Sequence, residues 1–223
     1  MSRKISESTV RRLSHYLRAL ERRVDQASTL SSEQLAREAG TTAAQVRKDL
    51  SLFGSFGKRG LGYPTGDLVT RIRTIMGLTR RWRVALLGAG RIGSALHAYG
   101  AFRDRGFDIV AIFDSDPAKI GTVREGVTIE PPSRVVESIR ERAIELAIVA
   151  VPVEVAQEMV DAVVTAGVRG VLNFAPRRLH APTGVAVQDV NMVMELEALA
   201  FALTVKGIEG DADEDPPCTA TAS

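Results

Sequence analysis

The sequence has only one cysteine, Cys218, and three histidines among its 223 residues. A single cysteine cannot close a disulfide within the chain, which excludes a disulfide-stabilised fold and an internal dithiol switch. The histidines, His15, His97 and His180, are far apart in the sequence and do not combine with Cys218 in the spacing of a metal site. We therefore expect no bound metal.

Long apolar runs are also missing. No uninterrupted stretch approaches the roughly 20 residues that a membrane-spanning helix needs. Residues 1–5, which include Arg3 and Lys4, are not followed by the apolar block of a secretion signal. The chain is long enough for two domains with separate cores. These features predict a cytoplasmic protein without a membrane partner.

The small net charge of +2 conceals a strong asymmetry. The first 83 residues carry a net charge of +10, and the remainder carries −8. A basic segment of this kind usually binds phosphate, nucleic acid or an anionic membrane, because clustered Lys and Arg release condensed counterions on binding. A basic face that is merely solvated is the alternative.

The start of the chain has the pattern of several helices. Apolar residues recur at steps of three and four through residues 8–24, which predicts a helix with one buried face. Ser31 and Gln34 have the spacing of a capping box, and Gly40 is suited to end the helix that they begin. The predicted buried positions of the first helix are Val10, Leu13, Leu17, Leu20 and Val24.

Thr42 and Gln45 repeat the capping-box spacing and begin another helix, so that a helix-turn-helix is predicted. Glycines alternate with aromatic and basic residues through 53–63, which predicts a tight hairpin, and Lys58 and Arg59 at its tip suit a minor groove. A plain helical hairpin with a solvated face is the alternative. The second helix exposes side chains of the types that reach base edges and phosphates in a major groove: Gln45, Arg47, Lys48 and Ser51.

The second half begins with a dinucleotide-binding pattern. An apolar run is followed by G-x-G-x-x-G, and Asp114 closes a second apolar run, 21 positions beyond Gly93. Gly88 permits a tight turn, Gly90 lets backbone approach a pyrophosphate, and Gly93 allows the helix to pack on the sheet. Asp114 can bond both hydroxyls of an adenosine ribose and would repel a 2′-phosphate, which favours NAD over NADP. The whole motif reads Gly88, Ala89, Gly90, Arg91, Ile92 and Gly93.

Further strands are expected at 146–151, 170–172 and 185–187, with a helix at 153–166. Strands that alternate with helices predict an α/β fold with a parallel, doubly wound sheet, whose ligand lies at the carboxyl ends of the strands. Residues at two such ends could form a nicotinamide pocket: Val151, Pro152, Asn173, Phe174 and Pro176.

The last predicted helix, residues 192–205, has more apolar surface than one buried face requires. It either packs on its own domain or crosses to a partner subunit, and we favour the second. The acidic tail after residue 207 has no apolar periodicity and is expected to be disordered. The predicted domains are 1–80 (winged helix), 81–190 (Rossmann), 191–207 (dimer-exchange helix) and 208–223 (tail).

The segment 46–63, with the glycine motif, residues 113–117 and 173–176, resembles the Rex family of redox-sensing transcriptional repressors. The resemblance covers nearly the whole chain except the acidic tail. It implies a homodimer with winged-helix domains on operator DNA, Rossmann-like domains that bind NAD(H), and a C-terminal helix exchanged between subunits. It also implies that NADH releases the operator.

By matching position, the resemblance places Arg18 of the first helix and Tyr99 of the first Rossmann helix in the link between the two domains. Members often have Asp before the terminal helix to pair with this arginine, whereas this chain has Asn191, and Asp189 is the nearest acid. A neutral amide supplies no full charge, so this contact is expected to be weaker. Met192 stands where an aromatic residue can face the nicotinamide.

Two other functions are less consistent with the sequence. An NAD-dependent dehydrogenase with an accessory N-terminal domain would need a general base near the nicotinamide. None of the three histidines has a partner that can be recognised from the sequence, and no separate substrate domain follows the nucleotide fold. A coenzyme A-binding module is disfavoured by Asp114 and the winged leader. The sequence therefore predicts a regulator and not an enzyme.

Overall fold

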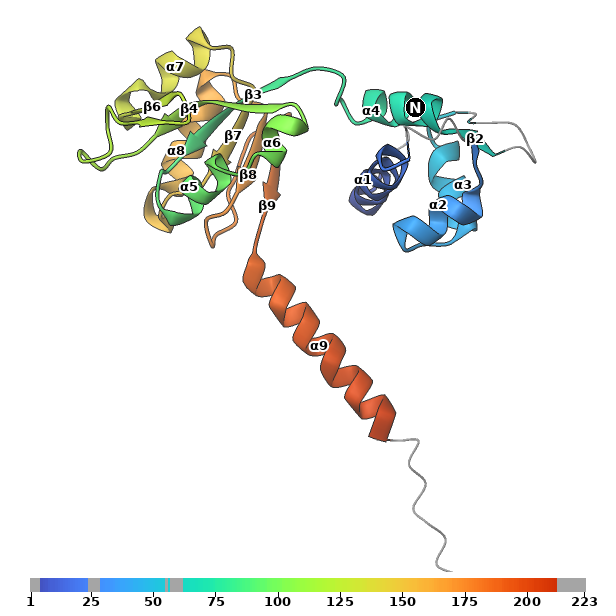
Figure 1. Cartoon of the computed structure of the whole chain (residues 1–223). Coiled ribbons are helices and arrows are strands. Elements are labelled where there is room, and N and C mark those ends of the chain that lie inside the picture. The colour runs from blue at the N-terminus through green and yellow to red at the C-terminus, as the bar shows by residue number, and fades with distance from the viewer. Residues whose placement is uncertain (1–4, 24–28, 55, 57–61, 212–223) are drawn as a thin grey trace, which may run out of the picture. The chain divides into compact units, whose positions relative to one another are not determined.

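The computed structural model describes residues 5–23, 29–54, 56 and 62–211 (Figure 1). The chain divides into two compact units, Met1–Arg81 and Trp82–Ser223. The division follows the basic residues Arg80 and Arg81, just before the first strand of the large sheet. The predicted wing residues Lys58 and Arg59, and the tail from residue 212, lie outside the described residues.

The first unit is mainly helical. Its core is formed by apolar residues of all its helices, among them Leu13, Leu17, Leu35, Val46 and Ile72. Strands β1 and β2 pair antiparallel, with Leu30 opposite Tyr63. The elements are α1 (Glu7–Glu21), β1 (Thr29–Leu30), α2 (Ser32–Ala39), α3 (Ala43–Ser51), β2 (Tyr63–Pro64) and α4 (Thr65–Ile75).

The first helix is confirmed, but one of its predicted buried positions is wrong. Val10 is 44% exposed, whereas Tyr16, which was not predicted, is fully buried. The buried stripe of α1 runs through Thr9, Leu13 and Tyr16. Val10 follows Thr9 by one position, which rotates its side chain by about 100° away from the stripe. Val24 lies outside the described residues.

The first capping box is confirmed, and the second is only half formed. The backbone N of Gln34 donates to Ser31 Oγ at 3.2 Å, and Gln34 Oε1 accepts from the Ser31 backbone N at 2.8 Å. The helix ends at Gly40, whose φ is +66°. At the start of α3, the backbone N of Gln45 donates to Thr42 Oγ1 at 3.1 Å, but the Gln45 side chain does not return to the cap. It bonds Asp49 instead.

The second unit is built on a seven-stranded sheet in the order β5-β6-β4-β3-β7-β8-β9. The predicted parallel arrangement is confirmed for β6-β4-β3-β7-β8-β9, and the short edge strand β5 pairs antiparallel with β6. The strands are β3 (Trp82–Leu87), β4 (Phe107–Phe113), β5 (Val123–Arg124), β6 (Val127–Glu130), β7 (Leu146–Val149), β8 (Gly170–Asn173) and β9 (Ala186–Asp189).

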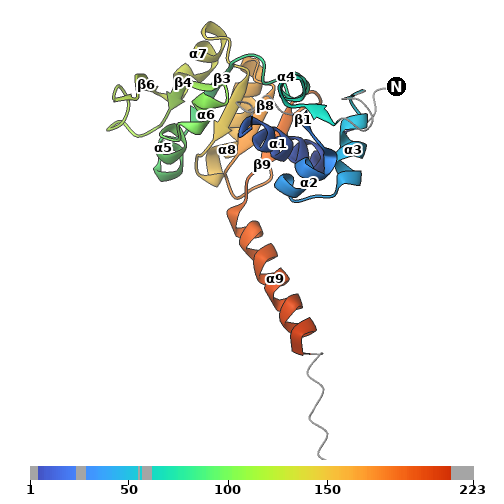
Figure 2. The same cartoon turned by 45° about the vertical axis from the view of Figure 1, so that its right-hand side comes forward.

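Helices cover both faces of the sheet (Figure 2). One face packs with α7 and α8 in a core that includes Phe113, Ile139 and Val160. The other packs with α5 and α6 around Leu86 and Ile112. The helices are α5 (Arg91–His97), α6 (Ala101–Asp104), the 3-10 turn η2 (Pro132–Arg134), α7 (Val135–Glu141) and α8 (Val153–Ala166).

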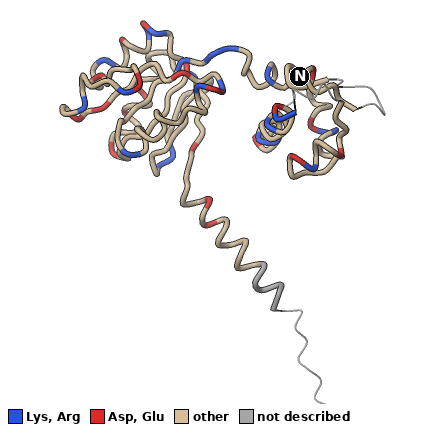
Figure 3. The backbone as a smooth tube through the Cα atoms, viewed as in Figure 1, with Lys and Arg blue, Asp and Glu red and all other residues tan. Residues whose placement is uncertain are grey.

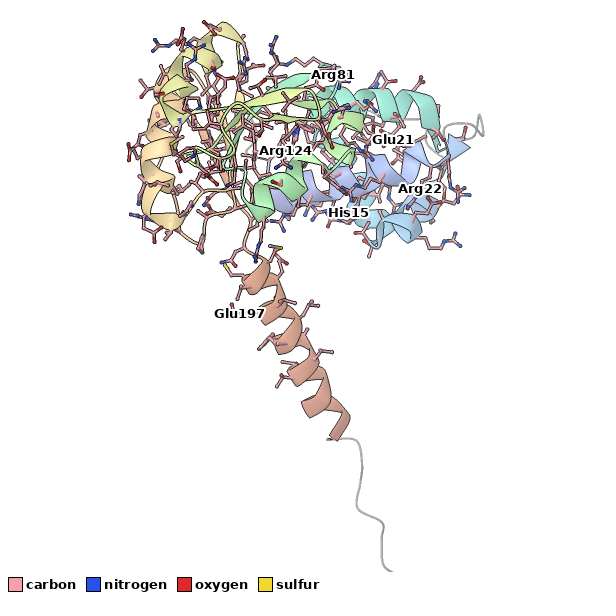
Figure 4. All side chains as sticks on the ribbon, turned by 60° about the vertical axis from the view of Figure 1, so that its left-hand side comes forward. His15, Glu21, Arg22, Arg81, Arg124 and Glu197 are labelled. Carbon is pink, nitrogen blue, oxygen red and sulfur yellow. The ribbon has the colours of Figure 1, made fainter. Side chains whose placement is uncertain are left out.

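Helix α9 (Met192–Asp211) follows β9, and its side chains from 192 to 204 are all exposed. Its large apolar side chains from Met192 to Leu203 are 60–72% exposed. Glu195 and Glu197 are the only charged residues between 192 and 205 (Figures 3 and 4). None of the helices in the described ranges is both long and apolar enough to cross a bilayer.

Candidate functional site

The glycine motif forms a tight turn between β3 and α5. Gly88 has a φ of +95°, and a Cβ there would lie 2.4 Å from the carbonyl oxygen of Ala150. A Cβ on Gly93 would lie 1.8 Å from the Gly88 carbonyl oxygen. Around Gly90, by contrast, no described atom lies within 4 Å of a Cβ position. The fold itself therefore requires the first and third glycines, whereas the second leaves open space in front of the turn.

Asp114 lies directly after β4 and is hydrogen-bonded to the same turn. Its Oδ2 accepts from the backbone N of Ala89 at 2.7 Å and from Lys119 Nζ at 3.2 Å, and its Oδ1 accepts from the backbone N of Asp116 at 2.9 Å. Burial raises the pKa of the Asp114 carboxyl, but these donors outweigh burial and lower it below its usual value. The group is therefore an ionised acceptor at neutral pH, and its remaining lone pairs can accept from ligand hydroxyls.

These residues line a pocket of about 470 Å³ at the carboxyl ends of the strands. Five predicted residues meet there: Gly88, Gly90, Asp114, Val151 and Pro152. Lys119, five positions after Asp114, also lines the pocket and was not predicted; its cation close to the strand-end acid in the sequence was the available signal. Other lining residues that were not predicted are Phe113, Ser115, Asp116, Pro132, Ala150, Val155, Glu158 and Met159.

The remaining residues of the predicted cofactor site do not line this pocket. Arg91 and Ile92 are exposed in the first turn of α5, and Ala89 contributes its backbone N–H to Asp114. Phe174 packs with the core on the α5 side of the sheet. Gly93 and Asn173 also lie outside the lining, as do the exposed Pro176 and Met192.

Asn173 is fully buried, and its amide holds the end of β8. Its Nδ2 donates to the Arg177 carbonyl oxygen at 2.7 Å and to Asp189 Oδ1 at 2.8 Å, while its Oδ1 accepts from the backbone N of Ala175. The side chain therefore connects β8 to β9.

In the first unit, α3 is the second helix of the α2–α3 pair and buries Val46, Asp49 and Leu50. Lys48 and Ser51 are exposed on its outer side. The remaining predicted DNA-contacting residues of α3 are held by neighbouring side chains. Arg47 turns toward α2, where Nη1 donates to Ser32 Oγ at 2.7 Å and lies 3.3 Å from Glu33 Oε1, and Gln45 donates to Asp49.

The proposed link between the domains involves residues of both units. Arg18 is exposed on α1 in the first unit. In the second, α5 ends at His97, so the expectation that Tyr99 belongs to that helix is wrong; Tyr99 lies in the following turn, with its ring edge against Phe102. Asn191 caps α9, since its Oδ1 accepts from the backbone N of Val193 at 3.0 Å.

The three histidines lie apart, two in hydrogen bonds within the second unit and one on the surface of the first. His97 Nε2 bonds the Arg124 carbonyl oxygen at 2.9 Å, and the His180 backbone N donates to Gln157 Oε1 at 3.0 Å. His15 is exposed on α1 (Figure 4). Within the described ranges, no three His, Cys, Asp or Glu side chains are grouped as metal ligands would be.

Comparison with known proteins agrees with this two-part architecture. Residues 4–51 match a family model described as "Putative DNA-binding protein N-terminus", and residues 79–177 match one described as "CoA binding domain". The redox-sensing transcriptional repressor Rex of Carboxydothermus hydrogenoformans is 45% identical over 89% of this chain and 96% of its own length.

Two solved structures of RSP, a Rex-family repressor, have the same fold. The complex with β-NAD+ and operator DNA has a TM-score of 0.87 at 30% identity and covers 95% of this chain and 98% of that one. The complex with β-NADH has a TM-score of 0.84 at 29% identity and covers 94% and 99%. This chain therefore belongs to the Rex family of redox-sensing transcriptional repressors.

Proposed function

We propose that this protein is a transcriptional repressor that binds operator DNA as a homodimer and is released when NADH occupies its Rossmann unit. Expression of its target genes would then follow the cellular NADH/NAD+ ratio. One observation carries this proposal: a single Rex-family chain contains both an exposed helix-turn-helix face and a pocket lined by the glycine turn and the ionised Asp114. Such a protein acts by binding and not by catalysis, in the cytoplasm, where it meets DNA and the NAD pool.

In this proposal, the turn at Gly88 and Gly90 holds the pyrophosphate, and Asp114 accepts from the adenosine ribose hydroxyls. The empty space at Gly90 supports the first assignment, since nothing in the described protein requires a glycine there. The ionised state of Asp114 supports the second, because a carboxylate accepts from hydroxyls and repels a phosphate on the same ribose. That repulsion disfavours NADP, and it also disfavours coenzyme A, whose adenosine ribose has a 3′-phosphate.

We further propose that residues 1–80 form the DNA-binding domain, with α3 in the major groove and the wing residues Lys58 and Arg59 in the minor groove. Lys48 and Ser51 are exposed on α3 and need no rearrangement to reach DNA. Arg47 can exchange its solvent-exposed partner Glu33 for a phosphate at little cost, because exposed ion pairs are weak.

The signal must arise at the nicotinamide end of the ligand. NAD+ and NADH share their adenosine and pyrophosphate groups, so only contacts around the nicotinamide can distinguish them. We assign this role to Val151, Pro152, the 173–176 loop and Met192. If NADH weakens operator binding about a hundredfold, or about 2.7 kcal/mol, then operator weakens NADH binding by the same factor.

We assign the dimer contact to α9, proposed as the exchange helix over residues 191–207. Its apolar side chains are exposed in the single chain, and such a surface is unfavourable in water without a partner. The sheet of the same unit has an apolar hollow of about 340 Å³ over β4, β3, β7, β8 and β9, lined by Val84, Phe107, Ile148, Leu172 and Val187 among others. Covering apolar surface of this kind on a second copy would stabilise the homodimer.

The test is fluorescence anisotropy of a labelled, A·T-rich inverted-repeat duplex at fixed salt, without nucleotide, with NAD+ and with NADH. Release by NADH alone is the expected result. Gly90→Ala should keep DNA binding and lose the response to NADH, whereas Gly100→Ala, a matched change where a Cβ also meets no described atom within 4 Å, should retain both. Tight binding that is indifferent to NADH would contradict the proposed signal, and absence of DNA binding would contradict the proposed function itself.

A further inference from the structure

The recognition helix α3 contains a buried carboxylate that none of the functions above uses. The side chain of Asp49 is only 2% exposed, and four donors surround it. Its Oδ2 accepts from Arg12 Nε at 2.6 Å and from the Tyr16 hydroxyl at 2.8 Å. Its Oδ1 accepts from Arg12 Nη2 at 2.8 Å and from Gln45 Nε2 at 2.7 Å. Each carboxylate oxygen therefore accepts two hydrogen bonds.

The protonation states in this cluster are fixed by its geometry. Burial raises the pKa of Asp49, but the bonds from Arg12, Tyr16 and Gln45 outweigh it and lower the pKa below the usual value. Burial, together with the adjacent carboxylate, raises the pKa of Tyr16, which keeps its hydroxyl proton. At neutral pH, Asp49 is thus a pure acceptor that is held in place from α1 by two side chains.

An ionised carboxylate also determines the orientation of a neighbouring side-chain amide, because only the amide nitrogen can donate to it. Gln45 must turn Nε2 toward Asp49, because the reverse orientation would place Oε1 against a carboxylate oxygen and lose the bond. Gln45 Oε1 then points away from Asp49, and among the described residues no donor is bonded to it. Gln45 is the third residue of α3 and is half-buried, at the end of the helix that contacts base edges in helix-turn-helix proteins.

We propose that Asp49 fixes the Gln45 amide so that α3 presents a carbonyl oxygen to the major groove, which makes position 45 select a base whose exocyclic amino group lies in that groove. Adenine and cytosine offer such a donor there, whereas guanine O6 and thymine O4 are acceptors that repel the amide oxygen. Arg12 and Tyr16 are positioning residues in this scheme. The inference rests on the proposed operator binding and adds to it the base class that one residue reads.

The test is selection of bound duplexes by the full-length protein from an inverted-repeat library with randomised half-sites, followed by anisotropy on duplexes that differ at one base pair. The unchanged protein should prefer A or C at one half-site position by roughly 5- to 150-fold, the range for a good base contact. Gln45→Met, which has similar length and no polar amide, should reduce the preference at that position alone to about twofold or less.

Gln45→Lys gives the reverse expectation. Its ammonium can still donate to Asp49 and directs a donor outward, so the preference at the same position should change to G or T. The matched controls are Gln157→Met and Gln157→Lys. Gln157 Nε2 donates to Asp161 Oδ1 at 2.8 Å with the same four-residue spacing, but on α8 in the other unit, so these variants should enrich the unchanged motif.

The inference is overturned if the unchanged protein enriches a motif that neither Gln45 variant alters, or if the altered position prefers G or T before substitution. Loss of all binding in both Gln45 variants with unchanged Tm also overturns it, since a base-reading residue leaves the phosphate contacts of α3 in place. If the unchanged protein enriches no motif, the proposed function fails first, and this inference fails with it.

Discussion

Replacing Arg12 with Met should destabilise the first unit more than any other single arginine substitution that we consider. The change keeps most of the apolar stem and removes the guanidinium that donates twice to the buried Asp49. Amide hydrogen exchange of α1 and α3 in the full-length protein measures the effect locally, because opening of these helices exposes their amides whatever the second unit does.

The expected size follows from the burial of the two partners. Removing one partner of a buried ion pair costs about 3–5 kcal/mol. The Arg12 side chain is 28% exposed, while that of Asp49 is 2%, so the lower end applies. About 3 kcal/mol corresponds to exchange that is faster by roughly a hundredfold or more. Tyr16→Phe removes one bond to the same carboxylate and should cost about 2 kcal/mol, or roughly 30-fold.

The control is Arg47→Met, which removes an arginine from α3 whose acidic partner is exposed. Its side chain and that of Glu33 are 55% and 63% exposed, so solvent already screens this pair. The bond from Arg47 to Ser32 Oγ is also lost, but its acceptor is a neutral hydroxyl, so exchange should accelerate by about tenfold or less. If Arg12→Met accelerates exchange no more than Arg47→Met does, then the bonds from Arg12 do not stabilise the buried Asp49, and the reasoning is refuted.

Three further predictions concern the pH dependence of stability, the glycine turn and the dimer contact. Because the pKa of Asp49 is lowered on folding, the ionised carboxylate should stabilise the folded first unit above the ordinary pKa of 3.8, and this contribution should disappear as the pH falls below that value. In Arg12→Met, acid unfolding followed by circular dichroism should therefore begin at a higher pH. An acid transition at the same pH as in the unchanged protein would contradict this. Gly93→Ala should lower Tm, because its Cβ would lie 1.8 Å from a backbone oxygen. Gly90→Ala should leave Tm unchanged and weaken NADH binding, measured by calorimetric titration. Equal Tm values for the two variants would argue against the packing role of Gly93. Replacing Leu196 and Leu199 of α9 with Ser should shift the protein toward monomer in sedimentation velocity. Replacing the exposed Val123 and Val155 with Ser is the control and should not change the sedimentation. A dimer that persists after the α9 substitutions would show that α9 does not make the proposed dimer contact.

Features that depend on neighbouring residues in the chain were predicted well. Ser31 and Gln34 form the expected reciprocal cap because both partners lie within one helical turn. The glycine turn and Asp114 also occur as expected, since a strand, a tight turn and the next strand end are set by local pattern and by the parallel arrangement. The same reasoning placed Gly88, Gly90 and Asp114 at one pocket.

Features that depend on distant residues were missed. Thr42 and Gln45 have the same spacing as the first capping box, yet the Gln45 side chain bonds Asp49, because Arg12 and Tyr16 from α1 hold an ionised acceptor beside it. Arg12 lies 37 positions from Asp49 in the sequence, and no local pattern reveals that they are partners. The side chain of Asn173 was expected at the ligand but donates a hydrogen bond to Asp189 of β9. This contact also joins residues that are distant in the sequence, so no local pattern reveals it.

The sequence by itself determined the family, the two-part organisation and the chemistry of the nucleotide turn, because these depend on residue types at fixed short spacings. Only the tertiary structure decided which polar groups are left for a ligand. It showed that Asp114 has Lys119 beside it, that Asn173 is already bonded, and that Asp49 sets the orientation of Gln45. Those outcomes depend on burial and on donors brought from elsewhere in the chain, which determine whether a carboxylate or an amide has capacity to spare.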